Sequence, residues 1–158
     1  MIVADEPADR LQQLVDREEI GRLFHRYAWH FDRNEPALVA ALFTADALVD
    51  YGPEVEVAVG RDVIEARVRG GLEATFAATS HHISNVEVTL RDSQNAHGTA
   101  YVYAWHRYCN GAPDGYLWGQ YHNRFERTPD GWRISALRLH GAGTVDFHRL
   151  TMHPVRPS

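Results

Sequence analysis

The spacing of apolar residues changes once along this chain, near residue 79, and that change limits the folds open to it. Before it, apolar residues recur every three or four positions, which predicts amphipathic helices over 8–32, 36–43 and 61–76. A short hairpin is predicted between the last two, with strands over 47–51 and 55–59. After it, alternation predicts strands over 80–90, 99–109, 116–127 and 132–139. This order predicts an α+β fold, in which three N-terminal helices pack over a strongly curved antiparallel sheet and enclose a pocket.

The composition is that of one globular domain spanning residues 1–158, with a core at about 8–140 and a tail at 141–158. A net charge of −5 without a basic run argues against nucleic-acid binding, and no apolar run is long enough for a membrane span. Residues 1–10 lack the layout of a signal peptide and Cys109 is the single cysteine, so we expect a cytoplasmic protein. The 10 His, 4 Trp, 7 Tyr and 6 Phe predict an aromatic-lined cavity for a small apolar or aromatic substrate.

Two side chains of the first helix carry chemistry. Tyr27 lies on the apolar face, and Asp32 lies at the C-terminal end, where the helix dipole disfavours a carboxylate. We interpret Asp32 as the group that orients a histidine from a distant strand. The alternative is that Asp32 is a solvated residue at the helix end.

The strand predicted over 80–90 offers that histidine. His82 has the same parity as Val86, Val88 and Leu90, so it is predicted to face the pocket, whereas the parity of His81 points away. His106, on the next strand, is predicted to face the same pocket. The alternative for each of these histidines is a packed or exposed residue without a role in catalysis.

The chain resembles the SnoaL-like branch of the nuclear transport factor 2-like superfamily. The resemblance covers about residues 8–140 and rests on the segments DREEIGRLFHRYAWHFDRN, ALFTADALVDYG, SHHISN, AWHRY and GQYHNRFERTPDGWRI. It implies a cone-shaped fold and a homodimer or homotrimer. Members include scytalone dehydratase, bile acid dehydratase and hexachlorocyclohexane dehydrochlorinase, which are lyases.

The resemblance also implies a set of site residues. Asp32 and His82 fall where these lyases place a catalytic Asp and His, while Tyr27, Tyr51 and His106 match further catalytic positions. Phe31 replaces a tyrosine of scytalone dehydratase, so the donor set differs. Substrate contacts are expected from Trp29 and Phe31 on the helix and from Gln120, His122 and Asn123 on a strand.

These residues suit a dehydratase that needs no metal or organic cofactor. His82 would abstract a proton next to a carbonyl, Asp32 would orient its ring, and Tyr27 and Tyr51 would donate hydrogen bonds. His106 would protonate the departing hydroxyl. The expected substrate is a hydroxylated cyclic ketone or a polyketide-like molecule. An isomerase or cyclase with the same base, a non-catalytic small subunit of a ring-hydroxylating dioxygenase, and a ligand-binding module remain alternatives.

Overall fold

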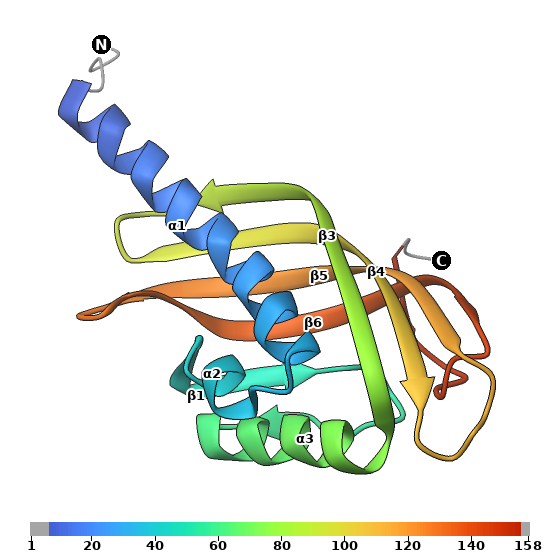
Figure 1. Ribbon diagram of the computed structural model, residues 1–158. Coiled ribbons are helices and arrows are strands. Elements are labelled where there is room, and N and C mark those ends of the chain that lie inside the picture. Colours follow the sequence, from blue (N-terminus) through green and yellow to red (C-terminus); the bar gives the residue numbers. More distant parts are fainter. Residues whose placement is uncertain (1–6, 156–158) are drawn as a thin grey trace.

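The computed structural model of the protein describes residues 7–155 (Figure 1). The helices are α1 (Pro7–Asp32), α2 (Pro36–Ala40) and α3 (Arg61–Ala74). The strands are β1 (Phe43–Asp50), β2 (Ala58–Val59), β3 (Phe76–Leu90), β4 (Asn95–Tyr108), β5 (Gly115–Thr128), β6 (Gly131–Val145) and β7 (His153–Pro154). The predicted α+β fold with a curved sheet is confirmed. Of the predicted domain bounds, residues 1–6 and 156–158 lie outside the described part.

The strands form one sheet in the order β2-β1-β6-β5-β4-β3, with β7 paired to β6. Strands β3 to β6 are an antiparallel meander, whereas β1 runs parallel to β6. The long strands bend, and α1 crosses one face of the sheet with α3 near its lower end (Figure 1). None of the helices within residues 7–155 is both long and apolar enough to cross a membrane.

The predicted apolar face of α1 is the face that is buried. Its members are Ile20, Leu23, Phe24, Tyr27 and Phe31. Phe24 meets Phe125 of β5 edge to face, with ring centroids 5.4 Å apart. Burial of large apolar side chains is the main stabilising contribution to such a contact. The helix is thereby held against the sheet from Asp16 to Phe31, whereas its first turns, residues 7–15, are largely exposed.

Some element bounds differ from the predicted ones. The second helix ends at Ala40 and Phe43 already belongs to β1, because this buried ring sits in the sheet core. The predicted strand 55–59 shrinks to the two residues of β2. Strand β6 extends to Val145, beyond the predicted end at 139. After it, a C-terminal segment, residues 146–155, folds back and adds β7 beside β6.

Candidate active site

The carboxylate of Asp32 lies at the end of α1 and contacts β3. The helix stops here because Asn34 adopts a left-handed backbone conformation, with φ of 56°, and Pro36 follows. Asp32 Oδ1 accepts a hydrogen bond of 2.8 Å from Thr79 Oγ1. Asp32 is therefore held by the neighbouring strand and is not a solvated helix end.

His81 is the histidine that Asp32 holds. Its Nδ1 lies 2.6 Å from Asp32 Oδ1, and its backbone N–H donates to Oδ2 at 2.7 Å. The His81 side chain is only 6% exposed. Burial alone would raise the pKa of Asp32, but the hydrogen bonds and charge of His81, together with Thr79, lower it below the usual value. An ionised carboxylate only accepts hydrogen bonds, so Nδ1 of His81 carries the proton and Nε2 is left as the basic nitrogen.

The prediction that His82 contacts Asp32 is wrong. His82 is exposed, its ring lies 5.8 Å from that of Tyr103, and its Nε2 lies 3.2 Å from Ser80 Oγ. The reason is a β-bulge between Ser84 and Glu87, where Asn85 has φ of 48°. A bulge adds one residue to a strand, so residues on its two sides follow opposite parities. Extending the alternation backwards from the partly buried Val86 and Val88 across the bulge therefore selected the wrong histidine.

Three tyrosines stand next to this dyad. The hydroxyls of Tyr27 and Tyr51 lie 2.6 Å apart, and the ring of Tyr121 meets that of Tyr27 edge to face at 5.5 Å. Burial is the largest cause that raises the pKa of each of these phenols above its usual value. They are therefore neutral hydrogen-bond donors at physiological pH. Tyr27 and Tyr51 were expected here, and Tyr121 was missed.

His106 faces the interior, as its parity on β4 predicted. It is 4% exposed, and its ring lies 5.4 Å from that of His81. Burial, followed by the charges of His81 and His148, lowers the pKa of His106 to about 3. Among the described residues, its Nδ1 has no hydrogen-bond partner. His106 is therefore a neutral ring at physiological pH.

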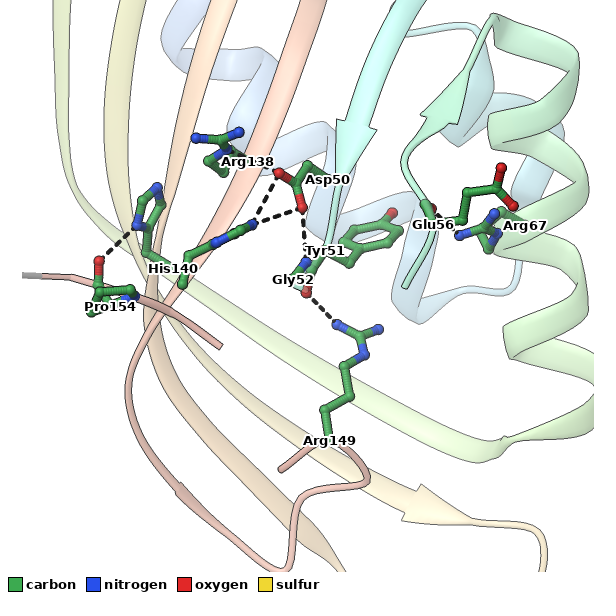
Figure 2. A network of polar contacts seen from close by, with 10 residues as sticks. Asp50, Tyr51, Gly52, Glu56, Arg67, Arg138, His140, Arg149 and Pro154 are labelled. Atoms are coloured by element: carbon green, nitrogen blue, oxygen red, sulfur yellow. Dashed lines mark hydrogen bonds and ion pairs between the residues drawn. The ribbon is translucent and has the colours of Figure 1, made fainter. Parts of the chain in front are cut away.

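The three tyrosines and the two inward-facing histidines line one cavity of about 570 Å³ between α1, α3 and the sheet. Phe31 lines it, as expected, and so do His81 and His106. The C-terminal segment contributes Phe147, His148 and Arg149, which sequence reasoning did not assign to the site. Arg149 Nη1 donates to the backbone oxygen of Tyr51 at 2.8 Å (Figure 2). A cavity of this size accommodates a small organic molecule.

Four of the predicted substrate contacts lie elsewhere. Trp29 is 62% exposed and stacks with Arg33, because a residue two positions from Tyr27 points to the opposite side of a helix. Gln120 and His122 are partly exposed and hydrogen-bonded to each other on the outer face of β5. Asn123 is buried on the inner face but does not line the cavity. Adjacent strand residues face opposite sides, so Tyr121 takes the place between the two outward residues.

A metal centre is not apparent among residues 7–155, where no group of three or more His, Cys, Asp or Glu side chains is placed to hold an ion. The ten histidines are instead divided between the cavity, the outer face of the sheet and the surface. The polar groups gathered in the cavity are thus imidazoles, phenols and two guanidinium groups. This set suits proton transfer and hydrogen bonding.

Comparison with known proteins gives one family. The SnoaL-like domain family matches residues 12–138 of the chain. No curated protein matches the sequence significantly.

Solved structures similar to this chain have the same fold. A candidate scytalone dehydratase from Novosphingobium aromaticivorans is 33% identical, with a TM-score of 0.85 over 92% of this chain and 97% of that chain. A candidate aromatic ring hydroxylase from the same organism is 25% identical, with a TM-score of 0.73 over 81% of this chain and 94% of that chain. A hexachlorocyclohexane dehydrochlorinase from Novosphingobium barchaimii is 17% identical, with a TM-score of 0.80 over 94% of this chain and 99% of that chain. At this identity the similarity supports the fold only.

Proposed function

Because this chain belongs to the SnoaL-like domain family, we propose that it is a lyase that removes water from a hydroxylated cyclic ketone without a cofactor. The observation that carries this proposal is the hydrogen bond of 2.6 Å between His81 and Asp32 at the wall of a cavity lined by phenols. The similarity to a candidate scytalone dehydratase supports the same class of reaction.

His81 is the base in this proposal. Its Nδ1–H donates to Asp32, which leaves Nε2 free to take a proton from the carbon next to the substrate carbonyl. The imidazolium that forms is stabilised by the Asp32 carboxylate, as in the hydrolase triads, although no nucleophile is involved here. His81 thus takes the role of the base that the sequence analysis predicted for His82.

The tyrosine pair stabilises the enolate. In the 2.6 Å contact one hydroxyl donates to the other. The O–H group of the accepting tyrosine is then available to donate a hydrogen bond to the substrate oxygen. Both phenols are neutral because burial raises the pKa of each. A donor fixed in this way before the reaction stabilises charge that develops in the transition state.

Expulsion of water completes the reaction. The enolate re-forms the carbonyl, its electron pair makes the new carbon–carbon double bond, and the hydroxyl on the next carbon leaves with the proton held by His81. The pKa of about 3 for His106 makes that ring a poor proton donor near pH 7. In this mechanism neutral His106 donates a hydrogen bond to the leaving hydroxyl, and His81 returns the proton.

The test uses the two adjacent histidines as a matched pair. The test substrate is a hydroxytetralone whose hydroxyl lies β to the carbonyl. Its dehydration yields a naphthol that absorbs at longer wavelength than the tetralone, so the reaction can be followed by absorbance. His81→Gln should lower kcat by roughly 10²–10⁴-fold, the usual contribution of a general base. His82→Gln, on the outer face, should keep wild-type activity.

Two outcomes would contradict the proposal. Full activity in a folded His81→Gln protein would exclude His81 as the base. A product with the same mass as the substrate would assign an isomerase or cyclase that uses the same dyad. Circular dichroism of both variants establishes that each is folded.

A further inference from the structure

The cavity beside the dyad is lined by two arginines and by no acidic side chain, and the carboxylate of Asp32 stands behind His81. Arg149 and Arg67 are both lining residues, and the lining includes no aspartate or glutamate. The chain as a whole has a net charge of −5, so this local excess runs against the balance of the protein. Both arginines are partly buried, and a charge that is partly removed from water without an ion-pair partner is costly, which suggests that the partner is a ligand.

Arg149 is the more enclosed of the two cations. It reaches from the C-terminal segment to Tyr51, and its guanidinium carbon lies 5.5 Å from the centroid of the Tyr51 ring (Figure 2). The Nη1 group donates to the Tyr51 backbone oxygen. A guanidinium has about five N–H donors, and Arg149 has no other hydrogen-bond partner within residues 7–155. Donors therefore remain for a molecule in the cavity.

No carboxylate of the described chain forms an ion pair with Arg149. Glu54 acts on it through its charge, but the Glu54 oxygens accept hydrogen bonds from the backbone N–H groups of Leu150 and Thr151. By contrast, Arg138 on the outside of the sheet is paired with Asp50 at 3.0 Å. Arg67 lines the cavity from α3 and donates to the backbone oxygen of Glu56 at 2.7 Å, again without an acidic partner (Figure 2).

From this arrangement we propose that the substrate carries a carboxylate and that Arg149 binds it. A guanidinium matches a carboxylate with two parallel hydrogen bonds, and a partly dry cavity strengthens them. The aromatic rings of the cavity then contact the apolar body of the substrate, while His81 and the tyrosine pair act on its ketone end. Arg149 is a specificity residue in this proposal, because it holds a group remote from the reacting atoms.

The inference rests on the proposed function only in taking this cavity as the substrate site. Its test therefore measures binding and not turnover. The probes are hydroxynaphthoate and the hydroxynaphthamide of the same substitution, which share a ring system and differ in charge. Isothermal titration calorimetry at pH 7 gives the dissociation constant of each probe.

The wild-type protein should bind hydroxynaphthoate more tightly than the amide. Arg149→Met should weaken the binding of hydroxynaphthoate by about 10- to 100-fold, the usual contribution of charge-assisted hydrogen bonds. It should leave the dissociation constant of the amide unchanged. Arg149→Lys should recover part of the loss. Arg124→Met, which removes an exposed arginine on the outer face of β5, should change the affinity for neither probe.

The outcomes separate the two proposals. A wild-type protein without preference for hydroxynaphthoate, or an Arg149→Met variant that loses both probes equally, would overturn the inference, because Arg149 would then only shape the cavity. The dehydratase activity of His81→Gln is a separate readout, because Arg149 holds a group remote from the reacting atoms. If that variant keeps its dehydratase activity, the proposed base is wrong while the binding result for Arg149 stands.

Discussion

Asp32 accepts hydrogen bonds from both the ring and the backbone of His81, so one carboxylate fixes the position and the tautomer of one histidine. The two residues are 49 positions apart and join the end of α1 to the middle of β3. Thr79 adds a third hydrogen bond to the same carboxylate. The lowered pKa of Asp32 follows from these contacts, which outweigh the opposing effect of burial.

Replacing Asp32 by Asn should remove activity without unfolding the protein. The amide of Asn can donate to Nδ1, which would place the His81 proton on Nε2 and leave no basic nitrogen for the substrate. We expect kcat to fall by roughly 10²–10⁴-fold with little change in KM. Asp130→Asn, in an exposed turn, is the matched control. Equal activity in the two variants would show that the carboxylate of Asp32 is dispensable.

Buried His106 should make the protein less stable in acid. Its pKa is about 3 in the folded protein and near its ordinary value of 6.5 in the unfolded chain. Between these values only the unfolded chain binds the proton, so the free energy of unfolding falls as the pH falls from 6.5 toward 3. One such group contributes a slope of up to about 1.4 kcal/mol per pH unit.

The variant His106→Phe isolates this contribution. Phenylalanine keeps an aromatic ring beside Phe76, whose centroid lies 4.9 Å from that of His106, and cannot bind a proton. Urea unfolding of both proteins at several pH values between 6.5 and 4.5 gives the two slopes. The variant should lose less stability on acidification, and its stability at pH 7 should not fall, because Nδ1 of His106 has no partner to lose. Identical slopes in the two proteins would contradict the lowered pKa.

The bulge at Asn85 should tolerate glycine and reject valine. A φ of 48° is a left-handed conformation that Gly and Asn adopt readily and β-branched residues do not. Asn85→Val should lower the free energy of unfolding by about 1–2 kcal/mol, while Asn85→Gly should leave it nearly unchanged. Denaturant titration compares them. Equal stability of the two variants would argue that the strand can absorb this residue without the bulge.

That bulge also explains which part of the site could be predicted. The helix face with Tyr27 and Phe31 followed from periodicity alone, because α1 is regular throughout. The inward orientation of His106 followed in the same way, since the pairing of β4 with β5 has no interruption. In β3 the extra residue reverses the parity, and SHHISN offers two adjacent histidines between which alternation has to choose.

The remaining site residues depend on contacts that no local pattern records. Arg149 meets Tyr51 across 98 positions, and the C-terminal segment has no strong periodicity. On β5, the family resemblance predicted substrate contacts from Gln120, His122 and Asn123. Adjacent residues of a strand face opposite sides of the sheet, so Gln120 and His122 could not share a face with Asn123. Only the packed structure distinguishes which of these side chains turns inward.

Asp50 is expected to control how firmly the C-terminal segment closes the cavity. Its carboxylate accepts hydrogen bonds from Gly52 N–H at 3.0 Å and from Arg138 Nε at 3.0 Å, and it lies 2.9 Å from His153 Nε2 (Figure 2). His153 belongs to β7, so this contact ties the end of the segment to β1. Arg149 lies four positions before His153 on the same segment, so we expect its place at the cavity to depend in part on this attachment.

Asp50→Asn should therefore loosen the segment more than the rest of the fold. Loss of the charge weakens the contacts with His153 and Arg138, and we expect a stability loss of roughly 1–3 kcal/mol. Hydrogen exchange followed by mass spectrometry should show faster exchange over residues 147–154 and unchanged exchange over 20–31 of α1. The affinity for hydroxynaphthoate should fall with it, because Arg149 is then less ordered. Uniformly faster exchange in both regions would instead mean that Asp50 supports the whole sheet, and the role in closing the cavity would be wrong.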